Sequence, residues 1–132
     1  MNLAQVLHQR WAAAAPLCAL LPTQRVFTGM SPDPTRPLAT IAKLGSRPLE
    51  AFNDGSAVDA ISVRFQVFCD GYDAAAAIVE QINVTFDRSR FPLAGSDRVL
   101  LMRRTNDAEQ QQDDGVWQMT VDFECTVYFE RT

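Results

Sequence analysis

Residues 116–130, VWQMTVDFECTVYFE, decide the fold of this chain. Apolar and polar side chains alternate without a break, which is typical of a β-strand with one buried face. The apolar positions are Trp117, Met119, Val121, Phe123, Cys125, Val127 and Phe129, and the polar positions are Gln118, Thr120, Asp122, Glu124, Thr126 and Glu130. The segment therefore predicts a long strand that lies on a core with one face only.

This predicted strand is long for the size of the chain. At roughly 3.3 Å per residue it would reach about 50 Å if it were straight. A compact domain of 132 residues should be about 36 Å across, from its expected radius of gyration. We therefore expect the strand either to bend at a bulge or to project and pair with another copy of the chain.

Upstream of this strand, the chain opens with a predicted helix. Leu3, Val6, Leu7, Trp11 and Ala14 recur at helical spacing, which predicts an amphipathic helix that Pro16 ends or kinks. A short second turn is expected over residues 17–21.

Further strands are expected at 25–27, 37–44, 61–69 and 98–104. A second helix follows the strand that ends at Cys69. Asp70 is its predicted N-cap and Asp73 lies in its first turn, where carboxylates suit the helix dipole. Its apolar stripe consists of Ala75, Ile78, Val79, Ile82 and Phe86.

Three segments predict loops, at 28–37, 45–58 and 105–115. The second carries Leu49 and Phe52, which we expect to be exposed, and the third is acidic and rich in Gln, with little to bury. The expected fold is therefore a single α+β domain over residues 1–132, a mostly antiparallel sheet packed on one face by two helices.

Composition excludes several classes of function. A net charge of −4 and a single lysine, Lys43, argue against a general nucleic-acid binder, which needs clustered basic side chains. The N-terminal segment is interrupted by His8, Gln9 and Arg10, so neither a signal peptide nor a membrane-spanning helix is expected. Cys18, Cys69 and Cys125 have no metal-like spacing and are expected to be reduced in a cytosolic environment.

No catalytic, cofactor-binding or metal-binding residue is assigned. The single histidine, His8, is expected to be a surface or helix-packing residue, and the chain lacks a nucleophile elbow, a phosphate loop and a dinucleotide fingerprint. Asp107, Glu109, Asp113 and Asp114 match no calcium loop, so we expect them to be solvated.

Asp122, Glu124 and Glu130 share one strand face and are likewise expected to be a solvated face. If that face lined a pore, its negative charge would repel a polyanion and let the polyanion slide past.

The order of these segments resembles the bacteriophage tail-completion family, whose members are also described as tail terminators or head-tail joining proteins. The resemblance covers nearly the whole chain. It rests on the Ala/Leu-rich opening helix, Arg25-Val26-Phe27 followed by TGMSPDPTRP (28–37), VRFQVFCDGYDAAAAIVEQI (63–82) running into an Ala-rich helix, and the terminal VDFECTVYFE (121–130). The acidic, Gln-rich loop departs from the pattern.

The resemblance implies a structural phage or prophage protein without catalysis or cofactors. It implies a homo-oligomeric ring, commonly a hexamer, that caps the tail tube, meets the neck proteins and leaves an axial channel for DNA, at the tail-neck junction of a virion assembled in the host cytoplasm. The alternative is a small acidic binding protein of the immunity or inhibitor type, which offers carboxylates to a basic partner. Self-association distinguishes the two. A third possibility, a hydrolase or ligand-binding α+β domain, would need a deep apolar pocket with convergent polar groups, and the sequence shows no sign of one.

Overall fold

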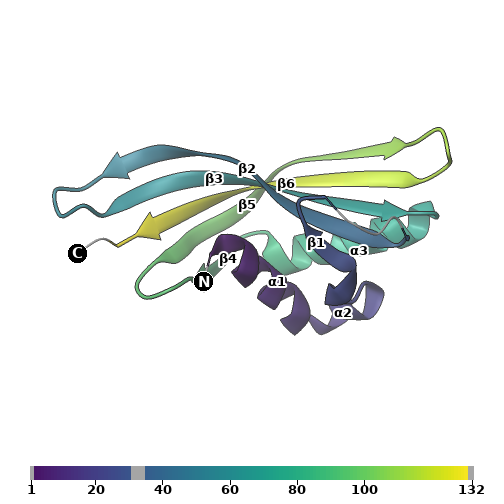
Figure 1. Ribbon diagram of the computed structural model, residues 1–132, viewed down its shortest axis with the longest axis horizontal. Coiled ribbons are helices and arrows are strands. Elements are labelled where there is room, and N and C mark those ends of the chain that lie inside the picture. The colour runs from purple at the N-terminus through teal and green to yellow at the C-terminus, as the bar shows by residue number, and fades with distance from the viewer. Residues whose placement is uncertain (1, 31–34, 131–132) are drawn as a thin grey trace.

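The computed structural model describes residues 2–30 and 35–130 and consists of one sheet with helices against one of its faces (Figure 1). The elements in chain order are α1 (Leu3–Ala13), α2 (Ala15–Leu20), a 3-10 helix η1 (Thr23–Arg25), β1 (Val26–Thr28), β2 (Leu38–Ala51), β3 (Ala57–Cys69), α3 (Tyr72–Phe86), β4 (Ser89–Pro92), β5 (Arg98–Gln111) and β6 (Trp117–Phe129). The predicted α+β class is confirmed.

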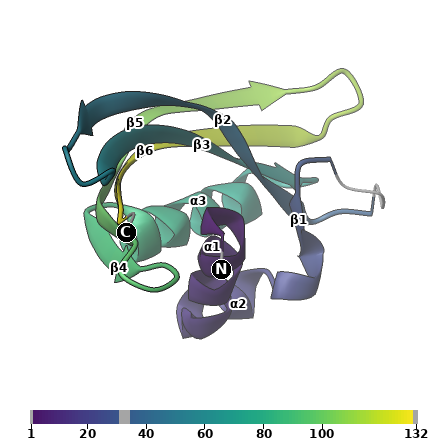
Figure 2. The same cartoon turned by 60° about the vertical axis from the view of Figure 1, so that its left-hand side comes forward.

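The sheet has six strands in the order β1-β2-β3-β6-β5-β4. It is mixed, because β1 runs parallel to β2 with Val26 opposite Ala39, whereas the other neighbouring pairs are antiparallel. The sheet is thus mostly antiparallel, with one parallel pair at this edge. Figure 2 shows that the sheet curls over the helices and encloses them on one side.

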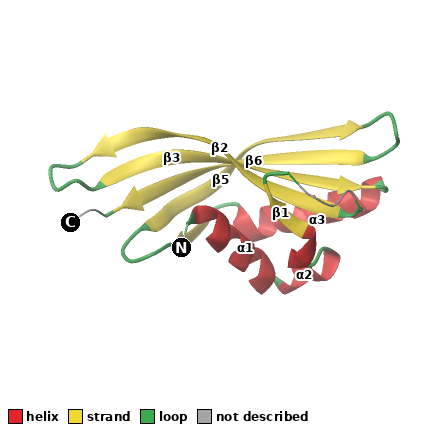
Figure 3. Cartoon of the chain, viewed as in Figure 1, coloured by secondary structure: helices red, strands yellow, loops and turns green. Residues whose placement is uncertain are grey.

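Three α-helices, rather than the two expected, cover the sheet in the described part of the chain. The difference lies at Pro16: α1 ends at Ala13, and α2 begins at Ala15 with the proline in its first turn. A proline is tolerated there because the first N–H groups of a helix have no partner within the helix. The proline thus divides the predicted N-terminal segment into two helices (Figure 3).

The strand β6 lies in the middle of the sheet. It pairs with β3 in continuous register, from Ala57 opposite Phe129 to Cys69 opposite Trp117, and it pairs with β5 on its other side. The expectation that this strand pairs with another copy is therefore wrong for β6, because both of its edges are occupied within the chain. The sheet does extend past the helices, since the β2–β3 and β5–β6 turns lie at opposite ends of the long axis (Figure 1).

Two of the three predicted loops are mostly strand. β2 continues to Ala51 and β5 continues to Gln111, so that 45–51 and 105–111 are paired with β3 and β6. These segments lack period two because both faces of the sheet are exposed beyond the helices, and the backbone ladder alone maintains the strand. The predicted loop at 28–37 does connect β1 and β2, although its residues 31–34 lie outside the described residues.

The two shorter turns that remain are built alike. In each, a glycine adopts a positive φ, 89° at Gly55 and 88° at Gly115. The carboxylate of the preceding Asp accepts a hydrogen bond from the backbone N–H two residues on, Asp54 from Ser56 at 2.9 Å and Asp114 from Val116 at 3.0 Å. Asp-Gly is the strongest short-range signal for a β-hairpin, and it occurs at both turns.

The core lies between the sheet and the helices. Trp11, Phe65, Phe86 and Phe123 are almost fully buried, and the Phe65 ring lies 4.9 Å from that of Phe86 and 5.4 Å from that of Phe123. The Trp11 indole donates a hydrogen bond of 2.9 Å to the carbonyl of Leu21. The apolar faces predicted for β6 and for α3 are both confirmed, with Val79 only partly buried.

Asp70 does not cap α3. The N-cap is Gly71, which has no side chain to bind the first N–H groups, and Asp73 lies in the first turn as predicted. The Asp70 carboxylate instead accepts a hydrogen bond of 2.7 Å from the Arg36 guanidinium. A long-range ion pair has replaced the local cap, and sequence spacing does not reveal such a partner.

Candidate assembly surfaces

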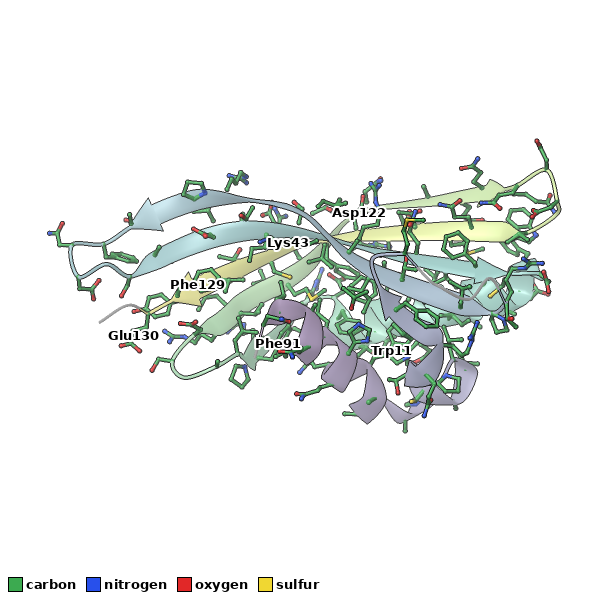
Figure 4. The ribbon with its side chains drawn as sticks, viewed as in Figure 1. Trp11, Lys43, Phe91, Asp122, Phe129 and Glu130 are labelled. Carbon is green, nitrogen blue, oxygen red and sulfur yellow. The ribbon has the colours of Figure 1, made fainter. Side chains whose placement is uncertain are left out.

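The sheet face that points away from the helices carries paired charges. Asp122 lies on this face, opposite the side on which Trp11 is buried (Figure 4). Its carboxylate accepts hydrogen bonds of 2.8 and 3.1 Å from the Arg64 guanidinium, and this contact raises the pKa of Arg64. Glu124 lies 3.5 Å from both Arg47 and Arg103. The negative charges of Asp122 and Glu124 are therefore compensated by arginines of the neighbouring strands.

One edge of the sheet is open along most of β2. β1 covers only Ala39–Ile41. From Ala42 onward, within residues 2–30 and 35–130, the ladder pairs β2 with β3 alone. Leu44 and Leu49 are bulged residues on this strand and are 50% and 47% exposed, and Phe52 in the following turn is 44% exposed. The predicted exposure of Leu49 and Phe52 is confirmed.

The opposite edge is open along the second half of β5. β4 pairs with β5 only as far as Met102, and the next free N–H group, that of Arg104, donates a hydrogen bond of 2.8 Å to the Asp87 carboxylate. Residues 105–111 then pair only with β6 in the described part of the sheet. Both sheet edges thus offer backbone groups for a further strand.

These two edges carry opposite charges. Residues 42–47 contain Lys43 and Arg47 and no acidic residue, whereas residues 105–111 contain Asp107 and Glu109 and no basic residue. Lys43 has no ion pair within residues 2–30 and 35–130. The Glu109 carboxylate holds the Tyr72 hydroxyl by a hydrogen bond and raises its pKa.

The residues considered for metal binding do not form a cage. Asp107 lies 3.1 Å from Arg104, and Asp114 caps the backbone of its own turn. Among the described residues, no three His, Cys, Asp or Glu side chains gather as metal ligands do.

The other reactive side chains are held in structural roles. His8 lies 2.8 Å from the Thr28 hydroxyl through its Nε2 atom, and burial lowers its pKa. The three cysteines are free thiols, and burial raises the pKa of Cys125 to about 12, which keeps it protonated and unreactive. No helix in the described part of the chain is long and apolar enough to cross a membrane.

An apolar cavity of about 340 Å³ lies between α1 and the sheet, and Lys43 and Phe129 both line it (Figure 4). Most of its lining is aliphatic, from Leu3, Leu7, Ile41, Ile61, Val63 and Leu93. The polar residues that line it are Asn2, Thr28, Lys43 and Asp97.

The family model for "Tail completion protein gp17" matches residues 5–128, nearly the whole chain. The chain belongs to this family. Members of the tail completion family are structural phage tail proteins and not enzymes, in keeping with the structural roles that His8 and the cysteines have here.

A solved structure has the same fold. The chain resembles a chain of the "Virion of native gene transfer agent (GTA) particle" with a TM-score of 0.72 and 16% sequence identity, over 93% of this chain and 92% of that chain. No curated protein matches this sequence.

Sequence reasoning missed the two open edges of the sheet. One signal was present: Phe52-Asn-Asp-Gly-Ser56 and Gln112-Asp-Asp-Gly-Val116 share an Asp-Gly turn, and such a turn predicts a strand on each side of it. The short strand β4 and the ion pairs between strands had no comparable local signal.

Proposed function

We propose that this protein is a tail terminator: a single domain that assembles as a ring, commonly hexameric, on the finished tail tube and joins the tail to the head. The family match over residues 5–128 carries this proposal. The open, oppositely charged edges of β2 and β5 support self-association, since a chain that joins copies needs two complementary surfaces.

In this role each subunit would bind the last ring of the tube, block addition of the next tube subunit and present a surface to the neck proteins. The protein would reside at the tail-neck junction of the virion after synthesis in the host cytoplasm. The likeness to a chain of a gene transfer agent virion supports this location.

The axial channel of such a ring would let DNA pass without specific binding. Arg47, Arg64 and Arg103 on the outer sheet face each lie beside a carboxylate. A face of paired charges offers phosphates no cluster of free basic groups, and strong nucleic-acid binding requires such a cluster.

The alternative, a small acidic inhibitor, would have fewer free carboxylates on the outer sheet face for the same reason. The carboxylates of Asp122 and Glu124 are already paired with arginines of the same chain. A basic partner would have to displace those contacts. The inhibitor proposal also requires a monomer that binds one foreign protein, which self-association would contradict.

The decisive experiment adds the purified protein to tail tubes assembled without it. Negative-stain images should show one ring at a single end of each tube, and tubes capped in this way should stop growing when more tube subunits are added. Light scattering on the protein alone gives its mass in solution. Tubes that remain uncapped and continue to grow would overturn the proposal.

A further inference from the structure

We propose that copies of this chain join head to tail, by antiparallel pairing of β2 residues 42–47 in one copy with β5 residues 105–111 in the next. The inference deepens the terminator proposal, because it names the surface that would build the ring. The pairing itself does not require a tail tube and is tested without one.

Each of the two segments is bounded at both ends. On β2, the segment begins where β1 stops at Ile41 and ends before Pro48, which has no N–H to donate. On β5, the segment begins after Arg104, whose N–H is bound to Asp87, and ends at the turn that starts at Gln112. The two open segments are therefore of similar length, six and seven residues.

Strand direction allows the sheet to continue from copy to copy. β2, β3, β6 and β5 alternate in direction because each neighbouring pair is antiparallel. β5 therefore runs opposite to β2. A second copy related by rotation alone can place its β5 beside the first copy's β2 as an ordinary antiparallel neighbour.

Charge selects this arrangement over pairing of like edges. Pairing of two β2 edges would place the Lys43 side chains of the two copies near each other, and pairing of two β5 edges would do the same for Asp107 and Glu109. Like charges that face each other across strands destabilise a sheet, whereas opposite charges stabilise it. Pairing of β2 with β5 joins the basic edge to the acidic edge.

The register follows from the parts of each edge that are already covered. Within one copy, Ala42 is the cross-strand partner of Arg64, Arg64 is that of Asp122, and Asp122 is that of Asn106. Ala42 and Asn106 therefore lie at the same height along the strands. If the neighbouring copy lay at that height, its β5 would collide with β1 of the first copy. A shift along the strands that sets Ala42 opposite Gln110 places β1 beside the neighbour's β5–β6 turn and avoids the collision.

This register brings Lys43 opposite Glu109. Both residues lie on the helix side of the sheet, since Lys43 is the partner of buried Val63 and Glu109 is the partner of buried Met119. The exposed side chain of Leu44 lies in the same segment and would be covered. The shift also tilts the strands relative to the ring axis, as closure of a sheet into a barrel requires.

The test uses cysteine cross-linking between these two positions. Lys43→Cys and Glu109→Cys are made singly and together in a Cys18→Ser background, because Cys69 and Cys125 are buried. Under mild oxidation, the double variant should give a ladder of cross-linked species on a denaturing gel. A mixture of the two single variants, denatured and refolded together, should give dimers, and neither single variant alone should do so.

Charge exchange provides a second readout. Lys43→Glu should raise the dissociation constant of the assembly at least tenfold, which light scattering detects as a lower mass at a given concentration. Lys43→Glu combined with Glu109→Lys should restore the original dissociation constant. Arg90→Glu on β4 is the matched control, since it makes the same change of charge at an exposed residue outside both segments. Thermal unfolding of each variant shows that the fold is retained.

Several results would overturn the pairing. They are cross-links within a single variant, the absence of a ladder from a sample that is oligomeric by light scattering, and a chain that stays monomeric at high concentration. A ring without the 43–109 cross-link would refute the edge assignment and leave the terminator proposal intact. Cross-linked assemblies that never cap tubes would refute the terminator proposal and leave the edge assignment intact.

Discussion

Arg64 and Asp122 lie opposite each other on β3 and β6, and the guanidinium donates two hydrogen bonds, of 2.8 and 3.1 Å, to the carboxylate. The Asp122 side chain is 15% exposed and that of Arg64 is 39% exposed. This pair links the two central strands on the face that the helices leave open. It also neutralises a carboxylate that the sequence presents as free.

We expect the Arg64–Asp122 pair to contribute about 0.2–1 kcal/mol, since one partner is substantially exposed. A double-mutant cycle with Arg64→Ala, Asp122→Ala and the double variant, measured by urea unfolding, isolates the coupling. The same cycle on the longer Arg103–Glu124 contact of 3.5 Å should give less. A coupling above about 3 kcal/mol would indicate that the pair is desolvated.

Phe123→Ala should lower the free energy of unfolding by about 3–5 kcal/mol, because it empties a core position. The Phe123 side chain is 1% exposed and packs against Phe65 and Phe86. Thr120→Ala, on the opposite face of the same strand, is the control and should stay within about 0.5 kcal/mol. Denaturant unfolding measures both, and a neutral Phe123→Ala would mean that the faces of β6 are reversed.

Gly115→Ala should cost at least about 1 kcal/mol, because Gly115 has a φ of 88° that a residue with a Cβ rarely adopts. Gly45→Ala provides the contrast: a Cβ there meets no atom within 4 Å, and its φ lies outside the left-handed region. That change should be neutral or slightly stabilising. Equal losses at both positions, in thermal unfolding, would argue against a built turn at Gly115.

His8 should make stability fall as the pH is lowered. Burial depresses the pKa of His8 in the folded state below its ordinary value of 6.5, so the unfolded chain binds the proton more tightly. The stabilisation is complete above the unfolded pKa and is lost as the pH falls from there through the folded pKa. His8→Gln should remove this part of the pH dependence of the melting temperature. An unchanged profile would assign the effect to other groups.

The apolar face of β6 and the stripe of α3 could be predicted because burial on one side imposes a period on the sequence. Phe123 and Ile82 occupy positions that such a period selects. The length of β2 and β5 could not be predicted in this way. Beyond the helices both sheet faces are exposed, so residues such as Gln110 and Gln111 carry no apolar pattern, and the adjacent strand alone keeps them extended.

By itself the sequence determined which side chains enter the core, where Pro16 interrupts the first helix and which family the order of segments resembles. Only the tertiary structure decided which strands lie side by side, which carboxylates are neutralised and which edges stay open. The physical reason is that a buried face requires apolar residues at regular spacing within one segment, which a short stretch of sequence reveals. Partners such as Arg64 and Asp122, or Asp87 and Arg104, are far apart in sequence and meet only once the sheet has formed.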